Sequence, residues 1–263
     1  MSATPIFSTH IEALPVSVYE TNAHVGQAAA GHAAEFLKET LDARGQANVI
    51  LATGNSQLSF LEALRSASDL DWSKVSIFHM DEYLGLDPAH PASFPLFLRR
   101  HFLEYLQPPA GAFFPVPGQH PDTAQACQEY ETLLRAYPAD LCALGIGENG
   151  HLAFNDPPAN FETDEPFIIV DLDEACRRQQ VGEGWCASFE DVPKRAISMS
   201  IRQILKSDQI VCTVPDARKA IAVKNTVEGM VTNLVPASIL QEHIACQLFL
   251  DAQAAGQLKQ GRG

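Results

Sequence analysis

Short apolar runs, separated by segments of helical spacing, restrict the fold of this 263-residue chain more than any other feature. A run such as "NVILA" is typical of a strand buried on both faces, because polar residues do not alternate with the apolar ones. Buried strands that alternate with helices form βαβ units and pair in parallel. The sequence therefore predicts an α/β fold: a single Rossmann-like domain over residues 1–263, with an open parallel sheet and helices on both faces. The strands are expected at 47–54, 74–80, 139–147, 194–200, 209–215 and 246–251, and the helices at 22–43, 56–67, 91–106, 122–136 and 217–229.

The charge balance excludes several classes of partner. The chain carries 18 basic and 32 acidic residues, which gives a net charge of −14. A nucleic-acid surface needs a basic footprint and an anionic membrane attracts basic segments, so neither partner is expected. No apolar run reaches the length of a membrane span. Any anionic ligand must be held by a few local groups against the field of the whole protein.

Two observations concern the compartment. The N-terminal segment lacks the basic and apolar regions of a secretory signal. The six cysteines form no CxxC pair, and several lie in apolar runs, which is typical of reduced, buried thiols. We therefore expect a cytoplasmic protein.

Three unusual segments directly follow expected strands: "ATGNSQ" at 52–57, "HMDEY" at 79–83 and "GIGENGHLAFND" at 145–156. In open α/β sheets, ligands bind beyond the carboxyl ends of the strands. The three segments should therefore meet at one edge of the sheet and form a site there.

The first two segments each have a structural explanation beside a functional one. Backbone amides with the hydroxyls of Thr53 and Ser56 can cradle an anion, or Ser56 can simply cap the next helix. Asp81 can serve as a general base, cap a helix, or bind a metal with His79. Metal binding is the weaker option, because no tight group of His and carboxylate ligands accompanies these residues.

The third segment places His151 between Glu148 and Asp156. An imidazole near carboxylates can move protons at neutral pH, whereas a lone histidine is often structural. Further along, Arg218 and Lys219 stand at the start of an expected helix, where basic side chains oppose the helix dipole. A bound anion would relieve that cost, and a solvated surface pair is the alternative.

Taken together and in this order, the segments resemble the glucosamine-6-phosphate deaminase family, which is related to the 6-phosphogluconolactonases. The lactonases typically carry a DER-type motif and a GH[TI]ASLFP-type loop, where this chain has "DEY" and "GHLAFN", so it is more similar to the deaminases. The resemblance covers most of the chain, from about residue 48 to about residue 251, and rests on "ATGNSQ", "MDEYLGL…HPASF", "GIGENGHLAFNDP", "VPKRAISMSI" and "RKAIAVKNTVEG".

The resemblance implies an enzyme that isomerises an aldose to a ketose and releases ammonia. Its substrate would be a phosphorylated amino sugar: glucosamine 6-phosphate and water would give fructose 6-phosphate and ammonia, without a metal or organic cofactor. Asp81 matches the base that moves a proton between C2 and C1, and His151 matches the residue that assists ring opening.

The resemblance also assigns the remaining site residues. Lys219 matches a lysine that pairs with the phosphate, and Thr53, Gly54 and Ser56 match the phosphate loop. The expected site is completed by Glu148 and Asp156 in catalysis and by Asn55, Glu82, Asn149 and Gly150 in substrate binding.

The chain departs from the family pattern at three positions. Asn149 stands where well-studied members have an aspartate, and Asp156 stands in place of a glutamate. An asparagine can orient an imidazole but cannot stabilise its charged form as a carboxylate does. The family's phosphate-binding arginine has no clear match, and Arg177 and Arg178 are the candidates to replace it.

Two other interpretations remain open at this point. One is lactone hydrolysis with His151 as the base for water, and the other is a sugar-phosphate-binding protein without turnover. Binding needs only Lys219 and the 53–56 loop, whereas deamination also needs Asp81 and His151 within reach of one ligand. The chain ends soon after "LFLDAQAA", without the longer tail of allosteric members, so no such regulation is expected. The hexosamine epimer and a homo-oligomeric state stay open.

Overall fold

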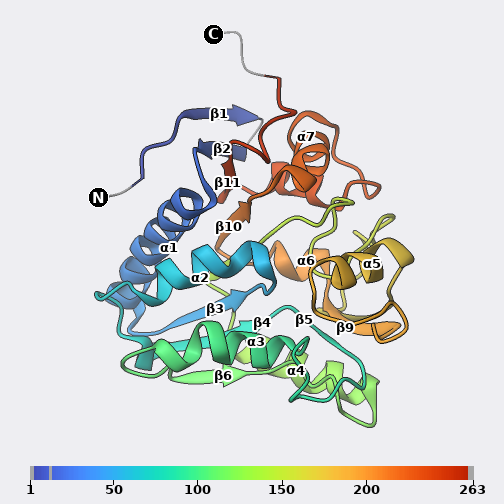
Figure 1. The fold of residues 1–263 in the computed structure, drawn as a ribbon. Coiled ribbons are helices and arrows are strands. Elements are labelled where there is room, and N and C mark those ends of the chain that lie inside the picture. The colour runs from blue at the N-terminus through green and yellow to red at the C-terminus, as the bar shows by residue number, and fades with distance from the viewer. Residues whose placement is uncertain (1–2, 12–13, 260–263) are drawn as a thin grey trace.

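The computed structural model describes residues 3–11 and 14–259 and arranges them in an α/β fold (Figure 1). The main sheet consists of β1 (Phe7–Ile11), β2 (Leu14–Tyr19), β3 (Ala47–Leu51), β4 (Val75–His79), β6 (Ala112–Phe114), β7 (Leu141–Leu144), β10 (Gln209–Val214) and β11 (Cys246–Asp251). Their order is β1-β2-β11-β10-β7-β3-β4-β6. All neighbours pair in parallel except β1 and β2, which pair antiparallel at one edge. The predicted open parallel sheet is confirmed, and the sequence did not indicate its antiparallel edge.

Helices cover both faces of the sheet. Successive strand residues point to opposite faces, so each strand contributes side chains to two cores. Ile50 of β3 belongs to the core on the side of α4, α6 and α7. Its neighbours Val49 and Leu51 belong to the core on the side of α1, α2 and α3. The two-sided burial explains why these strands are continuous apolar runs. The helices are α1 (Asn22–Arg44), α2 (Leu58–Arg65), α3 (Phe94–His101), α4 (Thr123–Ala136), α5 (Glu174–Gly182), α6 (Ile201–Ile204) and α7 (Ala220–Glu228).

The helix that follows β3 begins later than the sequence indicates. Residues Asn55–Gln57 form a 3-10 turn, and α2 starts at Leu58 with no side-chain cap. The prediction that Ser56 caps this helix is wrong. Its hydroxyl instead accepts a hydrogen bond of 3.3 Å from Gln57 Nε2. Ser56 lies in the 3-10 turn that follows β3.

Residues 194–200 form a strand as expected, but not in the parallel sheet. β9 (Arg195–Met199) pairs antiparallel with both β5 (Asp81–Tyr83) and β8 (Phe167–Asp171) in a separate three-stranded sheet. The main sheet has no place for it there, since β7 and β10 pair directly with each other. β5 continues almost directly from β4 and offers β9 an unpaired edge. This small sheet holds the "DEY" residues beyond the end of β4.

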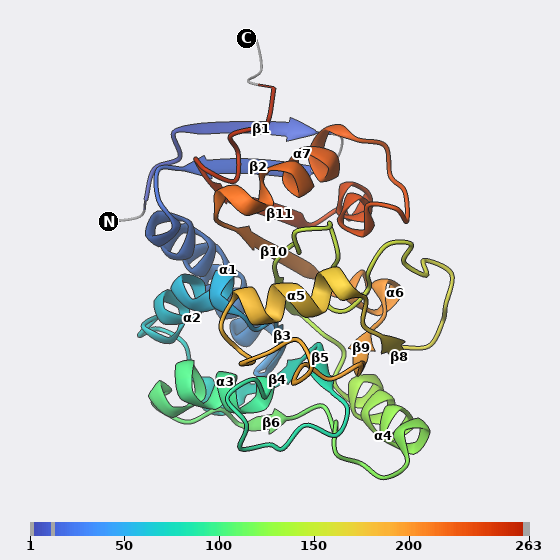
Figure 2. The ribbon, with the colours of Figure 1, turned by 45° about the vertical axis from the view of Figure 1, so that its right-hand side comes forward.

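A further helix that the sequence did not indicate completes the edge. α5 and the chain after it lie across the carboxyl ends of the central strands (Figure 2). Asp173 caps α5 by accepting a hydrogen bond of 2.6 Å from the Cys176 amide. The edge of the sheet is therefore covered on one side by α5 and on another by the small sheet.

Candidate active site

One cavity lies at the carboxyl edge of the main sheet. It is lined by residues that follow four of the parallel strands and by residues from α5 and the chain after it. The structure thus brings three predicted segments together at one edge. Of the predicted site residues, Thr53, Gly54, Ser56, Asp81, His151 and Lys219 line this cavity.

The turn after β3 is fixed by glycine and by a buried glutamine. Gly54 has a φ of 99°, which favours glycine because it has no Cβ. Gln57 accepts a hydrogen bond of 3.1 Å from the Thr213 hydroxyl, so the turn is tied to β10. Gly145 lies so close that an added Cβ would be 2.7 Å from Gln57 Nε2. Sequence analysis missed Gln57, whose contact partners lie far away in the chain.

Asp81 is a buried carboxyl at the first position of β5, where it pairs with Ser198. Burial raises the pKa of Asp81 to about 8, and the charge of Glu82 acts in the same direction. A carboxyl that holds its proton this strongly is a correspondingly strong base once ionised. Asp81 therefore has the position and the proton affinity of a general base.

Glu82 does not line the cavity, although the sequence analysis assigned it to substrate binding. Successive strand residues point to opposite sides, so its carboxylate faces the start of α3. It accepts hydrogen bonds from the Ser93 hydroxyl at 3.0 Å and from the Phe94 amide at 3.2 Å. Burial raises the pKa of Glu82 to about 7 against these hydrogen bonds. Its position supports α3, whose Phe94 lines the cavity.

His151 is held by its own glycine-rich loop. An added Cβ on Gly147 would lie 2.2 Å from His151 Cε1, so the ring packs directly on that glycine. His151 Nδ1 is 3.1 Å from Asp156 Oδ1. Asn149 Nδ2 donates to the same oxygen at 2.9 Å, and Asn149 Oδ1 accepts from the His151 amide at 3.1 Å.

The pairing keeps Asp156 ionised. Burial alone would raise the pKa of Asp156, but the hydrogen bond and charge of His151 outweigh it, and the pKa is below its usual value. Hydrogen bonds from Asn149 and Cys176 act in the same direction. A fixed carboxylate on Nδ1 orients the ring, so that the other ring nitrogen is available for proton transfer. Asn149 contributes through Asp156 rather than by contacting the ring.

Three other predicted residues lie outside the cavity. Glu148 is 39% exposed and its Oε1 is 3.5 Å from Arg218 Nη1, so its carboxylate is paired with Arg218 and does not line the cavity with His151. Gly150, with a φ of 88°, forms the turn of the loop, and its carbonyl accepts from the Ala237 amide at 2.9 Å. Asn55 donates to the Glu183 carbonyl at 3.4 Å and lines a neighbouring cavity.

Lys219 is the only lysine or arginine among the described residues that line the cavity. Its side chain is buried, and burial lowers its pKa, while the charges of Glu183 and Glu148 oppose that shift. A buried ammonium beside the amides and hydroxyls of the 53–56 turn is suited to an anion.

The two arginines expected to complete the anion site are occupied elsewhere. Arg177 Nη2 donates to the carbonyls of Phe189 and Val192 at 2.7 and 3.0 Å. Arg178 is exposed and pairs with Glu174 one helical turn away, at 3.3 Å. The hypothesis that either of them reaches the anion site is corrected by these positions.

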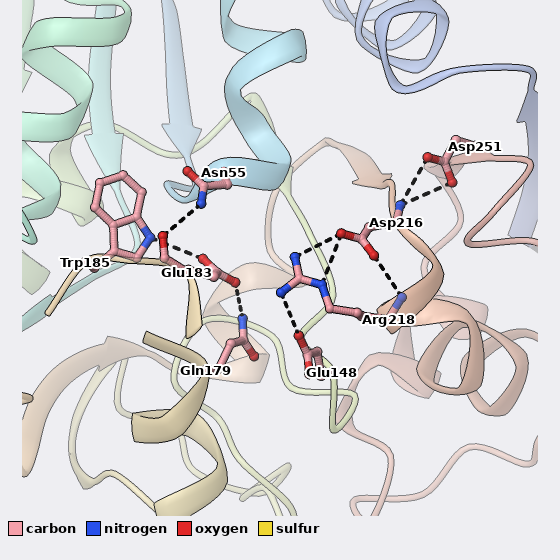
Figure 3. A network of polar contacts seen from close by, with 8 residues as sticks. All are labelled: Asn55, Glu148, Gln179, Glu183, Trp185, Asp216, Arg218 and Asp251. Carbon is pink, nitrogen blue, oxygen red and sulfur yellow. Dashed lines mark hydrogen bonds and ion pairs between the residues drawn. The ribbon is translucent and has the colours of Figure 1, made fainter. Parts of the chain in front are cut away.

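Sequence analysis also missed the residues that cover the cavity: Gln179, Gln180, Glu183 and Trp185. The Glu183 carboxylate accepts from Gln179 Nε2 at 2.8 Å and from Trp185 Nε1 at 3.2 Å (Figure 3). The only local signal was a tryptophan among glutamines and glycines in "QQVGEGW". Their role depends on where α5 docks, which no local pattern reveals.

The described parts of the chain hold no group of three or more His, Cys, Asp or Glu residues arranged to bind a metal ion. Within the same residues, no helix is long and apolar enough to cross a membrane.

Comparison with known proteins gives consistent matches. Residues 20–248 match the family model described as glucosamine-6-phosphate isomerases/6-phosphogluconolactonase. The glucosamine-6-phosphate deaminase of Lactobacillus delbrueckii subsp. bulgaricus is 37% identical over 227 residues, which cover 86% of this chain and 93% of that protein. Glucosamine-6-phosphate deaminase 2 of Bacillus subtilis is 37% identical over 231 residues, covering 86% and 92%.

Solved structures show the same fold. A monomeric glucosamine-6-phosphate deaminase aligns with a TM-score of 0.83 and 29% identity, covering 92% of this chain and 99% of that one. A 6-phosphogluconolactonase from Trypanosoma brucei aligns with a TM-score of 0.76 over 96% of this chain and 100% of that one. At 16% identity, the second similarity concerns the fold alone.

Proposed function

The chain belongs to the family of glucosamine-6-phosphate isomerases and 6-phosphogluconolactonases, and from this we propose that it is a glucosamine-6-phosphate deaminase. It converts glucosamine 6-phosphate and water to fructose 6-phosphate and ammonia. The observation that carries the proposal is that Asp81 and His151 line one cavity with Lys219 and the 53–56 turn. A protein that only binds a sugar phosphate would not need Asp81 and His151. The two relatives named above, each 37% identical to this chain, are both glucosamine-6-phosphate deaminases.

The chemistry begins with the sugar ring. His151, oriented by Asp156, transfers a proton between the C1 hydroxyl and the ring oxygen, which opens the ring to the aldehyde. Asp81 then removes the proton from C2, which is acidic because it lies beside the aldehyde carbon. The same carboxyl returns the proton to C1, and one proton of the ammonium group passes to the C1 oxygen, which becomes a hydroxyl. The double bond then joins C2 and nitrogen, as an iminium ion.

Water completes the reaction. It adds to C2 of the iminium ion, and one of its protons passes to nitrogen. The C–N bond then breaks and ammonia leaves, while the second proton of the water leaves the oxygen at C2 and is taken up by the ammonia or the solvent. The product is the C2 ketone of fructose 6-phosphate, so that atoms and charges balance. Lys219 and the 53–56 turn bind the phosphate, which takes no part in bond changes.

We also propose that the enzyme works in the cytoplasm. All six cysteines are free thiols, and five of them are buried. Free thiols in this number fit a reducing compartment.

The decisive assay supplies glucosamine 6-phosphate to the full chain and measures ammonia and fructose 6-phosphate together. We expect both products in equal amounts, and release that is slower by about 10²–10⁴-fold from the Asp81→Asn variant. Hydrolysis of 6-phosphogluconolactone without ammonia release from the amino sugar would overturn the proposal. Binding of the amino sugar phosphate without turnover would overturn it as well.

A further inference from the structure

The phosphate end of the cavity, at Lys219 and the 53–56 turn, carries little positive charge for binding a phosphate. A phosphate monoester bears a charge of about −1.5 to −2 at pH 7. Lys219 is the one lysine or arginine lining the cavity among the described residues. Glu183 lines the same cavity, and the charge of its carboxylate opposes an anion. A second cation is therefore missing from this end of the site.

A second cavity adjoins the first and contains such a cation. The two cavities share Ser56, Glu183 and Lys219, and the second is also lined by Arg218. A phosphate bound at Ser56 and Lys219 lies where the two cavities meet. Arg218 thus lines the space next to the phosphate, in a cavity that Asp81 and His151 do not line.

Two carboxylates hold the guanidinium in different ways (Figure 3). Asp216 accepts from Arg218 Nε at 3.1 Å and from Nη2 at 2.9 Å, a two-point contact. Glu148 touches only Nη1, at 3.5 Å. The Asp216 amide in turn donates to both oxygens of Asp251, which fixes Asp216 in place. The anchored contact and the loose one lie on opposite parts of the guanidinium.

The loose contact can be exchanged at small cost. The side chains of Arg218 and Glu148 are 51% and 39% exposed, and ion pairs of this exposure contribute little to stability. A guanidinium has five donors, so it can keep Asp216 and still offer Nη1 to a phosphate oxygen. Asp216 is the carboxylate that acts most strongly on Arg218, and the charges of Glu148 and Glu183 also compete with a phosphate for it.

From these contacts we propose that Arg218 is the second cation of the phosphate site: on binding, its Nη1 leaves Glu148 and pairs with the substrate phosphate, while Asp216 keeps Nε and Nη2. The inference rests on the proposed function for the identity of the ligand. It assigns to Glu148 the part of a competitor for Arg218, in place of the catalytic part that the sequence indicated.

Two variants of the same ion pair test this, because the proposal predicts opposite signs for them. The probe is calorimetric binding of fructose 6-phosphate, and separately of inorganic phosphate, to the full chain. Arg218→Gln should weaken both affinities roughly ten- to a hundredfold, as expected for a charged hydrogen bond. Glu148→Gln frees the guanidinium and should strengthen both. Arg178→Gln removes an exposed charge nearby and should change neither.

The directions of the two affinity changes also distinguish the proposal from a purely structural role of Arg218. If Arg218 only steadies the Glu148 loop, both variants break the same bridge and both affinities change in the same direction, which would overturn the proposal. Unchanged binding in Arg218→Gln would overturn it too. Because binding is measured without turnover, a failure of ammonia release would refute the proposed function and leave these affinities to decide the inference.

Discussion

The proposed function divides the cavity into a reaction end, at Asp81 and His151, and a phosphate end, at Lys219 and the 53–56 turn, and these two ends are built in different ways. At the reaction end, His151 is fixed by Gly147, Asn149 and Asp156, all within a few residues of it in the chain. At the phosphate end, the groups come from distant segments. The contact between Asn55 and Glu183, for example, joins residues 128 positions apart.

The difference shows which part of the site is rigid by local design. The His151 ring is oriented mainly by residues of its own loop, and Ala237 and Ser198 tie that loop to the rest of the fold. The phosphate end depends on how α5 docks over the edge of the sheet (Figure 2). Substitutions at the first end should act on kcat, and substitutions at the second should act on KM.

Asp81→Asn should have the largest effect of all. Removing a general base typically lowers the rate about 10²–10⁴-fold. The amide has nearly the same shape, so substrate binding and the fold should persist. The measurement is kcat for ammonia release, with circular dichroism and calorimetric binding of fructose 6-phosphate as controls. Full activity in this variant would show that the reaction end is elsewhere.

Gly147→Ala tests whether the His151 loop is as tightly fixed as its contacts indicate. The added Cβ would lie 2.2 Å from His151 Cε1, so the ring has to move. Misplacing a catalytic group by about 1 Å can cost about 10²-fold in rate, and we expect a loss of kcat of that order.

A matched glycine substitution serves as control for that loss. Gly31 on α1 has open space where its Cβ would be, so Gly31→Ala should leave kcat unchanged. Normal kcat in Gly147→Ala would mean that the loop adapts, and the contrast between the two ends would disappear.

The contrast between local and distant contacts also determines which parts of the fold and the site could be predicted from the sequence. The central strands and the three segments at their carboxyl ends were predictable, because continuous apolar runs and glycine-rich turns are local signals. His151 and Asp156 fall within one such segment. α5 was not predictable, since its polar sequence "EACRRQQVG" has no clear periodic apolar stripe.

Orientation was the other limit of the sequence. Asp81 and Glu82 are adjacent acidic residues, and only the pairing of β5 with β9 sets which one faces the cavity. Glu148 was expected in catalysis because it lies near His151 in the chain, but its partner Arg218 comes from after β10. Such choices depend on tertiary contacts that neither composition nor spacing encodes.

Lys219→Ala addresses the phosphate end. Loss of a charged hydrogen bond to the non-reacting phosphate should raise KM about ten- to a hundredfold and change kcat much less. Steady-state kinetics with glucosamine 6-phosphate gives both values. A fall in kcat with KM unchanged would mean that Lys219 acts on the transition state, so that the two ends do not divide the work as proposed.

The smallest effect is expected for Glu82→Gln, and it depends on the sign of a pKa shift. Asp81 must be ionised to act as a base, so kcat/KM should rise with pH as the Asp81 carboxyl, with its pKa of about 8, loses its proton. Burial is the main cause of that raised pKa and is retained in the variant. The Glu82 charge is the second cause, and removing it lowers the Asp81 pKa. The rising limb should therefore move to lower pH, with a gain of a few-fold at neutral pH.

The thermal stability of Glu82→Gln should fall, although its kcat/KM at neutral pH should rise. The Glu82 carboxyl accepts hydrogen bonds from Ser93 and Phe94, and glutamine can replace only part of them, so Tm should fall. The raised pKa of Glu82 means that its ionised form costs folding free energy, and glutamine removes that cost, so the fall in Tm should be largest below pH 7 and smaller above it. Glu39→Gln, an exposed carboxylate on α1, should change neither the pH profile nor Tm. If Glu82→Gln and the unmodified chain share one rising limb, the titrating group is not coupled to Glu82. Asp81 would then lose its assignment as the base, since Glu82 is the charged group that raises its pKa.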